Sequence, residues 1–150
     1  MSSIEERKEN DLKVDFIIDQ AAGTDKNAVE YLTLLSQALR TIDDIYDEFE
    51  IVTQNELLAV VEILFVRLPS NKFYQENREC LFSQHVSMWN AWEISNVLYS
   101  GDDLDKIYAH VLRDYVNEIL PVVALITQGY AKMKEINSLI RPLFKKELEK

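Results

Sequence analysis

Glycine and proline are scarce in this chain, with three of each among 150 residues. Typical proteins contain roughly 7% glycine and 5% proline, and a β-sandwich or β-barrel needs these residues for its many tight turns. The scarcity therefore excludes an all-β fold. Hydrophobic residues make up 47% of the chain, which is too high a fraction for a disordered protein. The composition predicts a folded helical domain.

Cysteine and positive charge are also in short supply. The only cysteine, Cys80, cannot form an internal disulfide, and its apolar surroundings in the sequence predict a small buried side chain. The chain has 16 Lys and Arg against 26 Asp and Glu, which gives a formal net charge of −10. A nucleic-acid-binding protein needs clustered positive charge to displace counterions. The charge therefore argues against a nucleic-acid partner and favours a protein partner, in particular a basic one.

Long hydrophobic runs are missing as well. Residues 1–10 are charged and have no apolar core of the kind found in secretory signals. The longest apolar stretches, residues 57–66 and 119–126, fall short of the roughly 20 residues that cross a bilayer. We therefore expect a cytoplasmic protein without a membrane partner, in the cell that produces it or in a cell infected by a virus.

Hydrophobic residues recur at helical spacing between residues 25 and 50. They follow one another at alternating steps of three and four residues, as in the seam of a helical bundle. The seam consists of Leu32, Leu35, Leu39, Ile42, Tyr46 and Phe49. Similar patterns predict further helices over residues 71–99, 103–127 and 130–146, with a kink at Pro121.

Two other segments have distinct patterns. Residues 53–68 are apolar on nearly every side of a helix, which predicts a buried helix at the centre of the fold. In residues 12–20 the apolar side chains of Val14, Phe16 and Ile18 alternate as in a strand. Because no partner strand is evident, this segment is either helical or an extended lead-in.

The chain has no internal repeat and no linker rich in glycine, serine or proline. We therefore expect one all-α domain over residues 1–150, a bundle of about five to six helices around the segment 53–68, with residues 1–24 as a loosely packed lead-in. Residues that favour helix starts support this division. They are Ser3 with Glu6, Asp25, Thr53 with Glu56, and the acids from Asp102 to Asp105.

Asp43, Asp44 and Asp47 spell a DDxxD motif within the helix predicted over residues 25–50. The motif resembles the first aspartate-rich motif of trans-prenyltransferases and terpene cyclases, which hold a diphosphate through Mg²⁺. Carboxylates four residues apart converge on one face of a helix, and Mg²⁺ prefers oxygen ligands. The resemblance implies an alternative function, in which a Mg²⁺-dependent enzyme acts on a diphosphate-containing substrate with these aspartates as metal ligands.

A helical wheel favours a different role for the acids of this helix. They lie on the side opposite the hydrophobic seam, with Arg40 among them as a nearby cation. The acidic residues are Asp43, Asp44, Asp47, Glu48 and Glu50. We predict that this face points to solvent, that Arg40 pairs with one of the aspartates, and that the remaining charge offers a contact surface for a basic protein.

The same aspartates are similar to half of a second enzyme motif. All-α nucleoside-triphosphate pyrophosphohydrolases carry an E-E-x-x-E helix followed by an E-x-x-D helix. The three aspartates correspond to the first half with shorter side chains, whereas Glu56 and Glu62 do not have the spacing of the second half. Glu62 is instead either a buried functional carboxylate or a residue at the edge of the core that is paired with a neighbouring helix.

Trp89 and Trp92 lie three residues apart and therefore share one face of their predicted helix. Such a pair is either an aromatic stripe in the core or an exposed anchor for a partner, because tryptophan is enriched at the energetic centres of interfaces. Both tryptophans are therefore candidate binding residues together with the acidic face.

Three segments carry a resemblance that covers about 60 residues. The order LPSNKFYQENRECLF, MWNAWEISN and YAHVLRDYVNEILPVVALITQGY is similar to small helical proteins carried by bacteriophages and prophages. The resemblance implies a phage-related origin, and hence a phage-infected cell as a location. It supplies no catalytic residues.

These observations together predict a non-enzymatic acidic protein without a cofactor, which acts through protein–protein interaction and is of the inhibitor or immunity type. Lys and Arg outnumber Asp and Glu within residues 129–150, so this end can pair with acidic helices of the same chain or of a second copy in a homo-oligomer. The predicted partner-binding residues are Asp43, Asp44, Asp47, Glu48, Glu50, Trp89 and Trp92.

Overall fold

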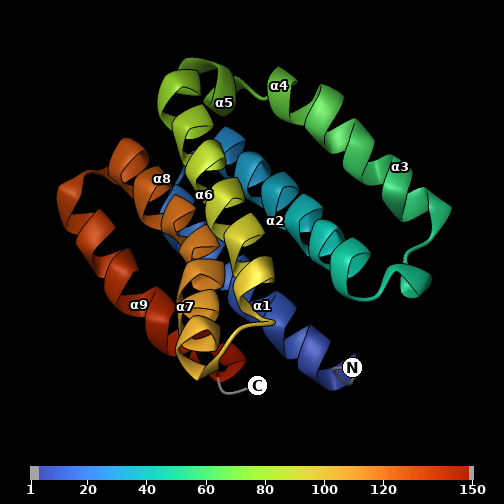
Figure 1. Ribbon diagram of the computed structural model, residues 1–150. Helices are drawn as coiled ribbons and strands as arrows, with labels where there is room; N and C mark the ends of the chain where they lie inside the picture. The colour runs from blue at the N-terminus through green and yellow to red at the C-terminus, as the bar shows by residue number, and fades with distance from the viewer. Residues whose placement is uncertain (1–3, 149–150) are drawn as a thin grey trace.

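The computed structural model describes residues 4–148, with side chains up to residue 143, and it contains helices and turns but no strand in that range. Its α-helices are α1 (Ile4–Ala22), α2 (Lys26–Asp47), α3 (Gln54–Glu62), α4 (Leu68–Ser70), α5 (Lys72–Glu76), α6 (Arg78–Leu98), α7 (Asp103–Asp114), α8 (Ile119–Gln128) and α9 (Tyr130–Leu148). Two 3₁₀ segments, η1 (Phe49–Ile51) and η3 (Tyr115–Glu118), and one π-helical segment, η2 (Ile63–Arg67), connect them. The predicted all-α class is confirmed (Figure 1).

Polar caps start several of these helices as the sequence predicts. The Asp25 carboxylate accepts a hydrogen bond from the backbone N–H of Ala28 at 3.0 Å and caps α2. Thr53 and Glu56 form a reciprocal capping box at the start of α3. Asp102 and Asp105 do the same at the start of α7, so these two acids have a structural role. The predicted cap at Ser3 lies outside the described residues.

The second half of α1 lies in the core. Ile17, Ile18 and Ala21 are buried where α1 packs against α8 and α2. Together with Val14 they recur at helical steps of three and four residues, which is a stronger pattern than the strand-like alternation in the same segment. Residues 12–20 are therefore helical, and a loosely packed lead-in is the wrong description of this part of the chain.

The segment predicted to be a buried central helix lies instead at the edge of the molecule. Figure 1 shows α3 and α4 running along one side, beside α2 and far from α9. This segment packs mainly on α2, so only its inner residues Val60, Ile63 and Leu68 are buried. Its outer apolar side chains stay in solvent, with Phe65 81% exposed. Because one neighbouring helix cannot cover an all-round apolar helix, the prediction of a central helix is wrong.

Two smaller predictions about this region also need correction. Glu62 is exposed on α3 and is neither a buried carboxylate nor a residue at the core edge. Cys80 is exposed in the first turn of α6 rather than buried, because the buried side of that turn is occupied by Leu81.

The predicted kink in the segment 103–127 is confirmed. The α-helix ends at Asp114, passes through the 3₁₀ turn η3 and resumes at Ile119, shortly before Pro121. Proline has no N–H for the preceding turn and clashes with it, which favours a break at this position. The break separates α7, which packs on α6, from α8, which packs on α1 and α9.

Candidate functional site

The predicted acidic residues and the predicted tryptophans meet in one place. The indole Nε1 of Trp92 donates a hydrogen bond to Oδ1 of Asp43 at 3.3 Å, across a sequence separation of 49 residues. The ring of Tyr46 meets the Trp92 ring edge-on, with centroids 5.5 Å apart, and the Trp89 ring lies 5.2 Å from that of Trp92. The end of α2 and the middle of α6 therefore form a joint surface.

We call this region the acid–aromatic surface. It consists of Asp43, Asp44, Tyr46, Asp47, Glu48, Trp89 and Trp92. Glu48 belongs to it because its charge acts on both Asp44 and Asp47. Glu50, the remaining predicted acid, is exposed on η1 and is not part of this surface.

The aromatic side chains of this surface are largely open to solvent. Trp89 is 47% exposed and Tyr46 is 55% exposed, whereas Trp92 is half-buried between them. The tryptophan pair is therefore not a stripe in the core. Tyr46 is also exposed, although the seam that contains it predicts burial. Its ring meets the Trp92 ring on α6 edge-on, and this contact does not cover it.

Arg113 of α7 holds the acidic side of this surface in place. Its Nη1 lies 3.6 Å from Oδ1 of Asp43 and 3.6 Å from Oδ2 of Asp47. The guanidinium also stacks over the Tyr99 ring, 4.7 Å from its centroid, and donates a hydrogen bond to the side-chain oxygen of Asn96. Asp43 and Asp47 thus face α7 rather than bulk water alone: Asp43 is half-buried, whereas Asp47 is exposed as the sequence predicts.

Arg40, the predicted cation for these aspartates, pairs with Asp11 of α1 instead. No local pattern in the sequence could have identified Arg113 as the replacement. It lies on a separate helix, and only the packing of α6 and α7 brings it to α2.

The DDxxD residues do not fit a magnesium site. The Arg113 guanidinium already lies against Asp43 and Asp47, where a metal would have to bind. The acids from Asp102 to Asp105 do not supply further ligands, because Asp102 and Asp105 are engaged as helix caps. Within residues 4–143, no group of three or more His, Cys, Asp or Glu side chains is arranged to hold a metal ion.

Two carboxylates of the surface are electrostatically strained. Partial burial raises the pKa of Asp47, and the charge of Asp43 raises it further, against the opposing effect of Arg113. Burial also raises the pKa of Asp44, although Arg7 acts in the opposite direction. In both cases the cation already present does not compensate for the lost water and the neighbouring acids. An additional positive group would therefore stabilise the ionised surface.

A second side-chain cluster lies on the other half of α6. The Tyr31 hydroxyl and Nε2 of His85 are joined by a hydrogen bond of 2.6 Å, and the two rings stack with centroids 6.0 Å apart. Phe73 and Tyr74 complete the cluster around the fully buried Tyr31 ring. Burial raises the pKa of Tyr31 and lowers the pKa of His85, so both groups are neutral near pH 7. This cluster is structural.

The lowered pKa of His85 predicts that stability falls in mild acid. In the unfolded chain this histidine takes up a proton near its ordinary pKa of 6.5, whereas the folded chain resists protonation to lower pH. The unfolded state then binds more protons, so the free energy of unfolding decreases as the pH falls below 6.5 and is unaffected by His85 above it. Urea unfolding at about pH 7.5 and about pH 5.5 measures the effect. The decrease should be smaller in His85→Gln, and an equal decrease in both proteins would contradict the assignment.

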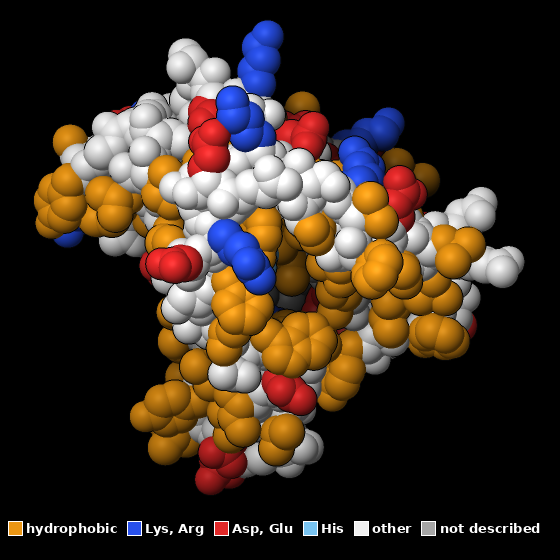
Figure 2. Space-filling view, turned by 90° about the horizontal axis from the view of Figure 1, so that it is seen from above, with side chains coloured by type: hydrophobic (Ala, Val, Ile, Leu, Met, Phe, Trp, Pro, Cys, Tyr) orange, Lys and Arg blue, Asp and Glu red, His pale blue; other side chains and the backbone are white. Residues whose placement is uncertain are grey.

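Apolar side chains extend the exposed surface beyond the tryptophans. On α6 they are Phe82, Val86 and Val97, and on α7 they are Leu104, Ile107, Tyr108 and Val111. The α7 residues follow helical steps of three and four, so they form one stripe on its outer side. Figure 2 shows from above how widely hydrophobic side chains are exposed, with a hollow among them. Contiguous apolar patches of this kind mark interaction sites in soluble proteins.

The fold and this surface define a small all-α protein with an exposed acid–aromatic region. No helix among the described residues is long and apolar enough to cross a membrane. Comparison of the chain with protein-family models, with curated proteins and with solved structures gives no match.

Proposed function

We propose that this chain is a non-enzymatic binding protein and that its acid–aromatic surface captures a basic segment of another protein. The observation that carries the proposal is the hydrogen bond between the half-buried Trp92 and Asp43, which joins the exposed Trp89 and its neighbour to a group of acids. Neither the acids nor the tryptophans would by themselves indicate a binding site, since acids and isolated apolar side chains are common on protein surfaces.

The charges of the surface support a partner with Lys or Arg side chains. Asp43 and Asp47 share the single cation Arg113, so one negative charge of this group has no partner. The raised pKa values of Asp44 and Asp47 indicate the same deficit of positive charge. An incoming cation would meet these carboxylates and could also lie over the Trp89 ring. The net charge of −10 would accelerate the encounter with a basic partner.

An inhibitor or immunity-type protein would act in this manner, by occupying a basic site on its target. No observation favours the alternative of a Mg²⁺-dependent enzyme, because Asp43 and Asp47, two of the three aspartates that it requires, already lie against Arg113.

Charge reversal at two half-buried acids of the surface tests the proposal. Asp44→Lys with Glu48→Lys reverses two charges and spares both ion pairs of Arg113, whereas changing Asp43 or Asp47 would disturb the fold. The partner isolated from host cells with the unaltered protein should bind this double variant at least about 30-fold more weakly, as expected for the loss of interface hot spots. Isothermal titration calorimetry at low and high salt measures the change.

The matched control is Asp15→Lys with Asp19→Lys on α1, which reverses two exposed acids at the same spacing of four residues. Trp89→Ala should weaken binding to a similar extent as the α2 reversal, with Tyr130→Ala on α9, which lies outside the surface, as its exposed aromatic control. If the control reversal weakens binding as much as the reversal on α2, or if Trp89→Ala binds normally, the surface is not the binding site.

A further inference from the structure

A cavity of about 350 Å³ lies between α1, α2 and the chain from α7 to α8. Its volume is within the range of roughly 300–1,000 Å³ that is typical of small-molecule sites. The cavity exists because α7 packs on α6 while α8 packs on α1, so the two helices diverge at η3. Val116 and Asn117 of η3 line it at this junction.

The inner part of the cavity is apolar. Its lining includes Ile17, Ile18, Leu32, Leu35, Ile119 and Leu120, all of which are buried. These side chains come from α1, α2 and α8 and belong to the hydrophobic core of the fold. A ligand that fills this part would gain free energy mainly by removing its own apolar surface from water.

The charged residues at the cavity already have ion-pair partners, although Nε of Arg113 is buried without a hydrogen-bond acceptor in the described part of the chain. Arg40 pairs with Asp11, Arg113 with Asp43 and Asp47, and Asp114 with Arg141 at 3.0 Å. A charged ligand would lose its hydration without meeting an unpaired opposite charge, which is unfavourable. The charge pattern therefore favours a neutral ligand.

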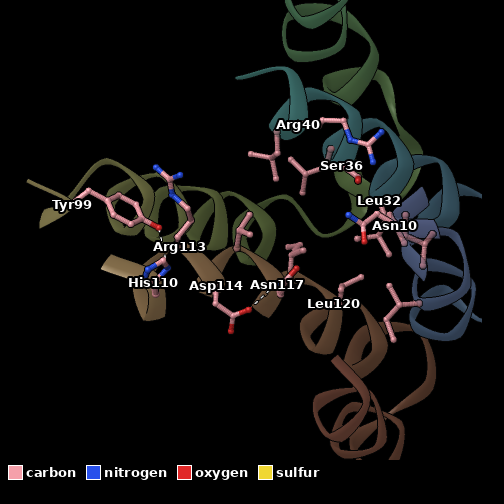
Figure 3. Close-up of a pocket in the computed structure, with 17 residues that line it drawn as sticks. Asn10, Leu32, Ser36, Arg40, Tyr99, His110, Arg113, Asp114, Asn117 and Leu120 are labelled. Carbon is pink, nitrogen blue, oxygen red and sulfur yellow. Dashed lines mark hydrogen bonds between the residues drawn. The ribbon is translucent and has the colours of Figure 1, made fainter. Parts of the chain in front are cut away.

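Two polar side chains of the cavity have no such partners. Asn10 of α1 and Ser36 of α2 are half-buried, and neither side chain forms a hydrogen bond with any residue in the described part of the chain. Figure 3 shows them on the same wall, opposite Tyr99, His110 and Asn117. An amide and a hydroxyl offer both donors and acceptors, so they can bind a hydroxyl, a carbonyl or an amide.

We propose that this cavity binds a neutral and largely apolar small molecule that carries one hydroxyl, carbonyl or amide group. The apolar body lies among the buried side chains of α1, α2 and α8, and the polar group bonds to Ser36 and Asn10. The site is separate from the acid–aromatic surface, although Arg113 contributes to both.

Fluorescence of the neutral probe N-phenyl-1-naphthylamine tests for the site. The full-length chain should give a saturable increase in fluorescence that corresponds to one probe per chain. Ser36→Trp fills the cavity from the α2 wall and should abolish this increase, whereas Thr33→Trp on the exposed side of the same helix should leave it unchanged. Circular dichroism checks that each variant is folded. Val116→Trp fills the cavity from the opposite wall and replaces Ser36→Trp if that variant does not fold.

Competition with three ligands of equal chain length tests the chemical class. Decan-1-ol should displace the probe at least tenfold more strongly than decanoate or decylammonium. Ser36→Ala should weaken the displacement by decan-1-ol about three- to tenfold, the usual contribution of one neutral hydrogen bond, with Thr33→Ala as the control. Probe binding that does not saturate, or that survives in the filled variants, would overturn the site. Equal displacement by a charged ligand would overturn the neutral class.

Discussion

Replacement of Tyr31 by alanine is expected to lower the free energy of unfolding by about 3–5 kcal/mol, the usual cost of truncating a buried aromatic side chain. Tyr31 is fully buried, and its ring contacts those of Phe73, Tyr74 and His85. It therefore connects α2 to α5 and α6 at a point where the backbones of α2 and α6 are not closely packed. Urea unfolding followed by circular dichroism measures the loss.

Two further variants separate the ring from its hydroxyl group. Tyr31→Phe keeps the ring but leaves Nε2 of His85 without its hydrogen-bond partner, which should cost about 1–3 kcal/mol. Tyr108→Ala removes a tyrosine that is 57% exposed and should change stability by less than about 0.5 kcal/mol. A Tyr31→Ala protein as stable as Tyr108→Ala would show that the aromatic cluster does not hold α6 on α2.

Replacement of Arg113 by alanine is expected to cost about 2 kcal/mol, because it removes a stacked cation and two partly exposed ion pairs at once. The guanidinium stacks on Tyr99 and lies between Asp43 and Asp47. Without it the two aspartates repel each other beside the Trp92 ring. The same urea unfolding experiment measures the effect, with Arg67→Ala, an exposed arginine of η2, as the control.

A double-mutant cycle shows whether charge is the cause. Asp43→Asn with Asp47→Asn should recover part of the stability lost in Arg113→Ala, because no repulsion then remains. The cost of the two Asn changes is measured in the unaltered protein and again in Arg113→Ala. If the free energy of unfolding falls by the same amount in both, the arginine acts through packing alone.

The sequence predicts well those features that depend on local spacing. The caps at Asp25 and Thr53, the helical run of α2 and the break before Pro121 all follow from neighbouring residues, and all are present. The acidic and aromatic candidate residues could be selected in the same way, because each set is a local pattern. That they form one surface could not be predicted, because the contact between Asp43 and Trp92 spans 49 residues.

The wrong predictions have a common physical origin. The number of apolar side chains in a helix does not reveal how many neighbouring helices will cover them. Residues 53–68 have the most apolar pattern but only α2 as a close neighbour, whereas α1 has a modest pattern and lies between α2, α8 and α9. Arg113 illustrates the same limit for charges, since Arg40 was the closer cation in sequence but faces Asp11 of α1.

The exposed apolar side of α3 and η2 has a thermal consequence. The heat capacity increase on unfolding arises mainly from apolar surface that becomes newly hydrated. Leu58, Val61 and Phe65 are already more than half exposed in the folded chain, so they add little to this increase. Calorimetry should therefore give a heat capacity change below the roughly 12–15 cal/mol/K per residue of typical domains. The stability of this protein should vary less steeply with temperature, and a partner that covers this helix should restore the usual curvature.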